Sequence, residues 1–196
     1  MYHGGSEYLK DLKIVRWQIS KKISGFLNVA KRCSWGYPQV ILCYPLKKGK
    51  PFPTLYWLTC PYLNKRVGDL ESKGMISDLL NKIETNADLR KKLKEANKAY
   101  AEKRAALLSE KIRNFLKLKF HSYLEVIEER GIGGVTEPEG VKCLHAHLAY
   151  YLADGKTPIG EEVLKILSSS ECLDKPKCAM IESCKQFRYC KKGVRL

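Results

Sequence analysis

The chain has 196 residues, of which 44% are hydrophobic and 10% aromatic, enough apolar material for one core and a small appended module. No apolar run approaches the roughly 18 residues of a membrane-spanning helix, so we expect no membrane partner. Residues 1–13 lack the basic and apolar regions of a secretory signal. We therefore expect a cytoplasmic protein.

The charge is strongly positive, with 36 Lys and Arg against 21 Asp and Glu and a net charge of +15. Such an excess favours RNA or another polyanion through counterion release. Lys and Glu are abundant while Asn and Gln are few, a composition that resembles thermophile proteins, in which solvated lysine faces are common. The charge alone is therefore compatible with nucleic-acid binding and with a solvated lysine-rich surface.

The first part of the chain predicts a small sheet. Apolar residues recur at a helical period over 7–20. Runs rich in aliphatic and aromatic residues then predict strands over 26–31, 39–44 and 54–59. Because short connections join these strands, we expect an antiparallel meander.

From Pro61 onward the pattern is helical. Apolar periodicity and breaker residues predict helices over 62–73, 77–84, 86–119, 120–130, 141–153 and 160–167. The sequence thus predicts an α+β fold, with a three-stranded antiparallel sheet packed with several helices over residues 1–167. A serine run then leads into a cysteine-rich tail over 168–196.

Four cysteines in this tail stand at equal intervals, with five residues between neighbours: Cys172, Cys178, Cys184 and Cys190. A six-residue step turns about 240° around an α-helix, so these thiols would line no single helix face. Their spacing lacks the Cys-x₂₋₄-Cys knuckles of zinc fingers and suits an iron–sulfur cubane, whose corners lie farther apart. Zinc, disulfides and free thiols remain the alternatives.

A second metal site is expected inside the core domain. In a meander the end of the first strand and the end of the third meet at one edge, which predicts that Cys33 and Cys60 are neighbours. Cys43 belongs to the opposite edge, where a packing role is expected. With Cys143 and His147, four residues apart on one helix face, Cys33 and Cys60 would form a Cys₃His zinc site or hold an iron–sulfur cluster.

Helix starts could also activate these thiols. Cys60 precedes Pro61 at a helix N-cap, and Cys143 is expected in the first turn of another helix, where the dipole stabilises a thiolate. His145 points away from Cys143 on an ideal helix, which leaves it for proton transfer or structural hydrogen bonding. A thiol enzyme using Cys143 or Cys60 with His145 or His147 as base is therefore a further hypothesis.

Cations along the predicted long helix form the candidate nucleic-acid surface. They are Arg90, Lys91, Lys94, Lys98, Lys103, Arg104, Lys111 and Arg113. If this surface binds RNA, its affinity should fall steeply with salt.

Four stretches carry a family resemblance. They are Arg32-Cys33 with Gly36 and Pro38, the run from Pro51 to Pro61, the run from Val141 to His145, and Thr157 to Gly160. Through them, residues from about 15 to 167 resemble an uncharacterised bacterial family catalogued as domain of unknown function 501. The resemblance implies membership but no reaction, and the tail cysteines are an addition to it.

Together these features favour a cytosolic cysteine-ligated metalloprotein, with an iron–sulfur cluster ahead of zinc. The inner cysteines would form an enzymatic site for a small or RNA-borne substrate. The competing hypothesis is a non-enzymatic module whose metal stabilises the fold while its basic surface binds RNA or a protein.

Overall fold

A computed structural model describes residues 5–21 and 23–183 of the chain. Its main sheet has three antiparallel strands, β1 (Phe26–Arg32), β2 (Pro38–Cys43) and β5 (Tyr56–Leu58), in the order β1-β2-β5. The α+β class and the small antiparallel sheet are therefore as predicted. Successive strands lie side by side because their connections are short.

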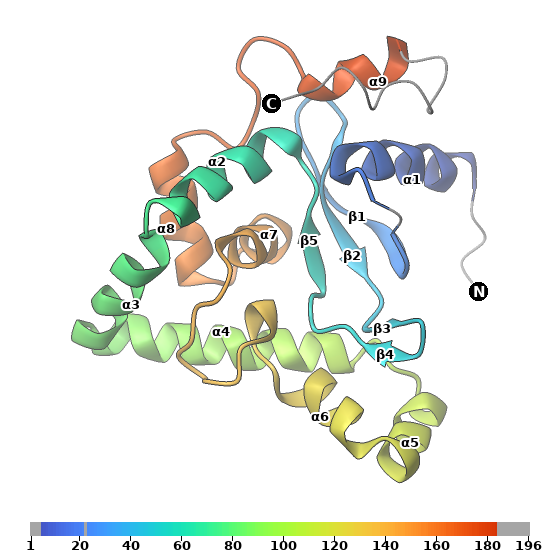
Figure 1. Cartoon of the computed structure of the whole chain (residues 1–196), viewed down its shortest axis with the longest axis vertical. Coiled ribbons are helices and arrows are strands. Elements are labelled where there is room, and N and C mark those ends of the chain that lie inside the picture. The colour runs from blue at the N-terminus through green and yellow to red at the C-terminus, as the bar shows by residue number, and fades with distance from the viewer. Residues whose placement is uncertain (1–4, 22, 184–196) are drawn as a thin grey trace.

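The two faces of the sheet pack against different layers, because side chains alternate along a strand. On the central strand β2, Val40 belongs to a cluster with Leu58 and Leu148, whereas Ile41 packs with Val15 of helix α1 (Ser6–Ile19). Helix α1 therefore covers one face of the sheet and the helical layer covers the other (Figure 1). This double coverage explains why β2 is almost wholly buried.

A second, two-stranded ribbon lies in the connection between β2 and β5. It pairs β3 (Leu46–Lys47) with β4 (Lys50–Pro51) around Lys48 and Gly49, which both adopt positive φ. Such a two-residue turn is the ordinary hairpin connection, since its twist matches that of the strands. The sequence had predicted only a short connection between two strands at this place.

The helices follow the predicted positions with shifts of a few residues at their ends. They comprise α2 (Pro61–Ser72), α3 (Met75–Thr85), α7 (Leu144–Asp154) and α8 (Pro158–Leu167), with a short 3₁₀ turn η1 (Ile132–Gly134) before α7. Pro61 and Pro158 occupy first turns, where the missing N–H costs nothing. The side chain of Thr157 caps α8 by accepting from the backbone N–H of Gly160.

The single helix predicted over 86–119 is wrong. The structure has α4 (Ala87–Ala105) and α5 (Glu110–Lys119), followed by α6 (His121–Glu129). The break lies where Leu108 turns inward to pack with Leu116, Leu124 and Ile127. A straight helix would carry residues beyond Ala105 away from this cluster, so burial of Leu108 outweighs helix continuity. Ser109 then caps the restarted helix through the N–H of Ile112.

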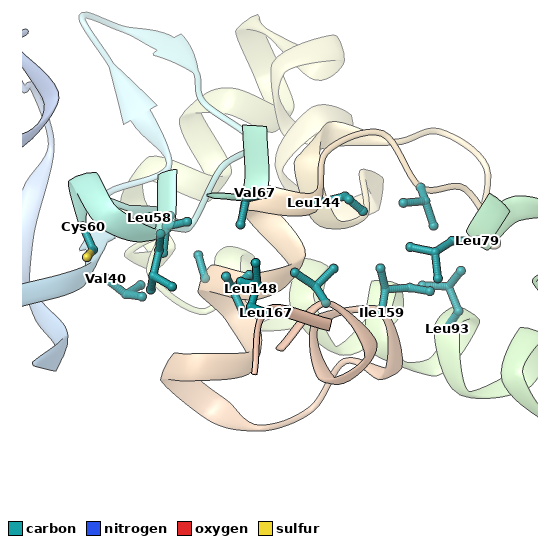
Figure 2. Close-up of a cluster of buried hydrophobic side chains, with 14 of the residues drawn as sticks. Val40, Leu58, Cys60, Val67, Leu79, Leu93, Leu144, Leu148, Ile159 and Leu167 are labelled. Carbon is teal, nitrogen blue, oxygen red and sulfur yellow. The ribbon is translucent and has the colours of Figure 1, made fainter. Parts of the chain in front are cut away.

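Helix α7 is the centre of the molecule and lies between the sheet and α8 (Figure 1). Its Leu144 and Leu148 are fully buried in the largest apolar cluster. In Figure 2 this cluster extends from Val40 and Cys60 at one end to Leu79 and Leu93 at the other. The N-cap of α2 therefore lies at one margin of the core.

The described part of the tail returns to the sheet. After Ser168 closes α8 with positive φ, the chain passes the start of α2 and reaches the β1–β2 turn (Figure 1). It contains a 3₁₀ turn, η2 (Lys177–Ala179), and the short helix α9 (Met180–Ser183). Cys184 and Cys190 lie outside the described residues, so the structure does not place the complete tail tetrad. Within the described ranges, no helix combines the length and the apolarity needed to cross a bilayer.

Candidate metal centre

The edge of the sheet brings two cysteines to one cavity. Cys33 directly follows β1, where its N–H donates to Tyr37 O at 3.0 Å and fixes a tight turn through Gly36. Cys60 follows β5 and is the N-cap of α2. Both thiols line the same small cavity, in the arrangement expected for the outer strands of a meander.

The tail brings two more cysteines to this cavity. Cys172 and Cys178 line it together with Cys33 and Cys60, although these residues come from opposite ends of the chain. The space between them is about 10 Å³, close to what one water-sized atom needs. We call these four side chains the four-cysteine cluster.

Polar contacts hold the tail against the β1–β2 turn. The N–H of Ser34 donates to Glu171 Oε1 at 2.9 Å, and Trp35 Nε1 donates to the carbonyl of Cys172 at 3.3 Å. Gln39 Nε2 donates to the carbonyl of Ser170 at 2.6 Å. These contacts place Cys172 at the cavity by fixing its own carbonyl and the two residues before it.

Helix α1 fixes the other tail cysteine. Gln18 Nε2 donates to the Sγ of Cys178 at 3.3 Å and to the carbonyl of Pro38 at 2.8 Å. Cys178 is only 5% exposed and packs with Ile14 and Tyr37. One glutamine therefore joins the sheet, the first helix and the tail beside the four-cysteine cluster.

Burial keeps the thiols of Cys60 and Cys178 protonated when no cation is near them. It raises the pKa of Cys60 to about 12, against the weaker opposing effect of the Leu63 and Tyr62 N–H groups at the start of α2. Burial also raises the pKa of Cys178, and the hydrogen bond from Gln18 offsets part of that rise. A reactive thiolate at Cys60 is thus disfavoured, whereas a bound cation would remove the proton by its own charge.

A separate cluster gathers at the opposite end of α2. Ligand atoms of Glu71, Cys143 and His145 all lie within 4.8 Å of one another, and within the described ranges these are the only three such side chains to meet so closely. Glu71 Oε1 lies 3.2 Å from His145 Nδ1 and accepts from the N–H of Leu144 at 2.6 Å. We call these three side chains the Glu-Cys-His cluster.

The backbone at Cys143 explains this second grouping. Cys143 is the N-cap of α7, with an extended φ of −151°, rather than a member of its first turn. The helical-wheel prediction that His145 points away from Cys143 therefore does not hold. Burial lowers the pKa of His145, but hydrogen bonding to Cys143, the charge of Glu71 and the Asn64 carbonyl together raise it to about 9.

His147 belongs to neither cluster. It is fully buried in α7, and its Nδ1 lies 3.0 Å from Thr157 Oγ1. Burial lowers its pKa to about 3, so the imidazole is neutral. The four-ligand grouping expected from Cys33, Cys60, Cys143 and His147 thus does not form, because α2 and the helical packing place these side chains in three locations.

Cys43 lies apart from both clusters and is fully buried beside Val15, Phe26 and Ile41. Burial raises its pKa to about 12. This placement fits the packing role expected from the sequence.

The candidate nucleic-acid surface loses one of its members. Arg104 is fully buried and donates to the carbonyls of Ile127, Pro53 and Arg130, so it cannot contact a polyanion. Lys103 and Arg113 have acidic neighbours, Asp154 and Glu128. Nucleic-acid binding by Arg90, Lys91, Lys94, Lys98, Lys103, Lys111 and Arg113 stays a prediction.

Sequence reasoning missed three polar residues at these sites, Gln18, Glu71 and Glu171. Each lies in a polar helical or tail segment, where such residues ordinarily face water. Only their distant partners, at Cys178, His145 and Ser34, distinguish them. No local pattern in the chain could have found them.

The fold defines a cysteine-rich α+β protein, and its described residues contain two separate groups of side chains of the types that can bind metals. The chain belongs to the family described as "Protein of unknown function (DUF501)", whose model matches residues 29–165. This range includes Cys33, Cys60 and the whole Glu-Cys-His cluster and ends before Cys172 and Cys178. No curated protein and no solved structure matches the chain.

Proposed function

We propose that this protein is a cysteine-ligated metalloprotein whose centre is held by Cys33, Cys60, Cys172 and Cys178. The observation that supports the proposal is the convergence of these four cysteines, from three separate segments of the chain, on one cavity of about 10 Å³. Ordinary core packing does not require four cysteines at one place. Thiolate ligation to a metal does.

The proposed centre differs from the one expected from the tail alone. It combines two cysteines of the family-matched domain with the first two of the tail, whereas the sequence had indicated Cys172, Cys178, Cys184 and Cys190. In the proposed centre the metal joins the tail to the sheet edge. The tail then supplies two of the four ligands of this centre and does not form a metal site of its own.

An iron–sulfur cluster is the proposed occupant, with zinc as the alternative. In a tetrahedral zinc site with Zn–S bonds of about 2.3 Å, neighbouring sulfurs lie about 3.8 Å apart. No three sulfurs of the four-cysteine cluster come within 4.8 Å of one another. This wider spacing, together with the absence of a Cys-x₂₋₄-Cys knuckle, favours a cubane. A cubane would displace the cysteine side chains outward from the small cavity.

Four cysteine ligands also bear on what the centre does. If each thiolate binds one corner of a cubane, no iron is left open to a substrate. We therefore propose an electron-transfer or structural role for this centre, and assign no substrate chemistry to it. The basic surface is not needed for either role.

The test is metal and sulfide analysis, with a visible spectrum, of protein purified without oxygen. We expect about four iron and four sulfide per chain and broad visible absorption. The single variants Cys33→Ser and Cys60→Ser should lose the iron, the sulfide and the visible absorption. The double variant Cys172→Ser, Cys178→Ser should lose them as well.

Two matched controls sharpen this test. The double variant Cys184→Ser, Cys190→Ser should keep the cluster, and so should Cys43→Ser, which changes a buried cysteine remote from the cavity. If the Cys184, Cys190 variant loses the metal while Cys33→Ser keeps it, the tail holds its own centre and the proposal is wrong. One zinc per chain without sulfide would support the site and overturn the choice of cofactor.

A further inference from the structure

The Glu-Cys-His cluster joins the end of one helix to the start of another. Glu71 is in the last turn of α2, Cys143 caps α7, and His145 follows in the first turn of α7. The carboxylate of Glu71 is fixed by the N–H of Leu144, so it faces the α7 terminus. A carboxylate, a thiol and an imidazole thus lie together, although no single sequence motif contains all three.

Hydrogen bonding defines which nitrogen of His145 faces the other two side chains of the cluster. His145 Nε2 lies 3.1 Å from the backbone carbonyl of Asn64. A carbonyl only accepts, so Nε2 carries a proton and donates it. Nδ1 then faces Glu71 and Cys143. Histidine ligands in metal sites ordinarily have this arrangement, in which the outer nitrogen donates to a carbonyl and fixes the inner one toward the ion.

The separation of the ligand atoms fits one small ion. Two ligands about 2.0–2.1 Å from a tetrahedral zinc ion lie about 3.3 Å from each other. Glu71 Oε1 and His145 Nδ1 are 3.2 Å apart, and all three ligand atoms fall within 4.8 Å. The spacing is thus close to that of a mononuclear site.

We infer that Glu71, Cys143 and His145 bind a single zinc-like divalent ion, with the fourth coordination position open to solvent. Mixed sulfur, nitrogen and oxygen donors suit zinc and its spectroscopic substitute cobalt. The side chains of Glu71 and His145 are each 27% exposed, so water reaches the cluster. Cys143 is also part-exposed.

Three protein ligands with one open position are the ligand count of catalytic zinc sites. An ion held this way lowers the pKa of its bound water and polarises a carbonyl or phosphoryl oxygen. The chemical class that fits the site is therefore metal-assisted hydrolysis or hydration. This inference does not depend on the four-cysteine centre.

The experiment uses the full chain with Cys33→Ser, Cys60→Ser, Cys172→Ser and Cys178→Ser, which removes the four-cysteine cluster and its thiolate signal. We expect this background protein to bind about one Co²⁺ per chain and to show a thiolate-to-cobalt charge-transfer band in the near ultraviolet. Adding Cys143→Ser should abolish the band. Adding Glu71→Gln or His145→Gln should weaken Co²⁺ binding by more than about tenfold. Even mutation of a residue that only hydrogen-bonds to a metal ligand costs about 10- to 100-fold in metal affinity.

Glu84→Gln in the same background is the matched control, because Glu84 is an exposed carboxylate on α3 away from both clusters. It should leave the Co²⁺ titration unchanged. Circular dichroism melting of each variant confirms that a lost band is not lost folding. A background protein with no thiolate band, or one whose band survives Cys143→Ser, overturns the inference. Either result leaves the iron and sulfide test of the four-cysteine centre unaffected.

Discussion

Cys60 and Glu71 lie at opposite ends of helix α2, 11 residues and about 16 Å apart along its axis. Cys60 faces the cavity shared with Cys178, whereas Glu71 contacts His145 at the start of α7. One rigid helix therefore contributes one side chain to each cluster and keeps the two clusters from merging.

This separation predicts independent loading of the two sites. Cys60→Ser should remove the iron and sulfide but leave Co²⁺ binding at the Glu-Cys-His cluster intact. Glu71→Gln should have the opposite pattern, because no ligand is shared. Parallel iron analysis and Co²⁺ titration of both variants measure this. Loss of both signals in either variant would show that the sites are coupled.

The tail should depend on the metal for its order. The described tail buries few large apolar side chains, while ordering each residue costs about 1–2 kcal/mol of backbone entropy. A structural metal contributes on the order of 10 kcal/mol and offsets that cost. We therefore expect trypsin to cut after Lys177, an exposed residue of the tail, rapidly in metal-free protein and slowly in loaded protein, as followed by mass spectrometry.

Cys33→Ser supplies the critical comparison for that experiment. It changes no residue of the tail, yet it should expose the tail to trypsin as strongly as Cys172→Ser does. The double variant Cys184→Ser, Cys190→Ser is expected to stay resistant. A tail equally resistant in every reduced sample would mean that the contacts of Gln18, Ser34 and Trp35 hold it alone.

Arg104 should be essential for stability and not for nucleic-acid binding. Burial lowers its pKa to about 10, and its guanidinium satisfies three backbone carbonyls. Arg104→Met leaves these carbonyls without donors, at a cost of about 2–4 kcal/mol of unfolding free energy. Arg104→Lys should recover little of this loss, because an ammonium lacks the planar fork. Urea unfolding measures both.

Lys94→Met is the control for Arg104, because Lys94 is exposed on the same helix. It should change the unfolding free energy by less than about 0.5 kcal/mol. Equal effects at the two positions would contradict the structural role of Arg104.

Two helical glycines should respond oppositely to alanine. A Cβ at Gly160 would collide with the backbone carbonyl of His147 and the Cβ of Tyr151, so α8 and α7 would have to separate. We expect Gly160→Ala to cost about 1–3 kcal/mol. Gly68 in α2 has nothing within 4 Å of its added Cβ. Gly68→Ala should therefore stabilise the protein by about 0.5–1 kcal/mol.

Thermal melting with denaturant titration distinguishes these two outcomes. The essential comparison is the sign of the change, since both substitutions add the same methyl group to a helix. A Gly160→Ala variant as stable as Gly68→Ala would mean that α7 and α8 are not in the close contact described.

His147 predicts a specific loss of stability in acid. Its folded pKa of about 3 lies below the unfolded value of about 6.5, so the unfolded chain takes up the proton first. The neutral His147 makes its full contribution to the unfolding free energy above pH 6.5. This contribution falls by about 1.4 kcal/mol per pH unit as the pH decreases from 6.5 toward 3. His147→Leu should remove this slope. The difference in unfolding free energy between wild type and variant, measured from pH 7 to 4, cancels the other titrating groups.

The direction of this effect is the decisive feature. A difference that stays constant with pH, or that grows in favour of the wild type as the pH falls, would contradict a buried neutral imidazole. The buried Nε2 of His147 has no hydrogen-bond partner among the residues that the structure describes, which supports the expected sign.

The sequence by itself determined the features that depend on neighbouring residues. Alternating apolar runs with short connections specified the meander, and the meander placed Cys33 and Cys60 at one edge. Pro61 marked the start of α2 correctly, whereas α8 begins at Pro158, two residues before the predicted start. These are local rules, in which a few adjacent residues define both the element and its direction.

Only the tertiary structure decided which cysteines meet. Cys172 joins Cys60 because Trp35 and Gln39 bind backbone carbonyls of the tail and Ser34 binds the Glu171 side chain. These contacts join segments more than 130 residues apart. The helical period could not show that Cys143 faces His145, because an extended N-cap breaks that period. Glu71 completes their cluster only because the end of α2 packs on the start of α7. The sequence thus showed which residues are able to bind a metal, whereas their grouping depended on how distant elements pack.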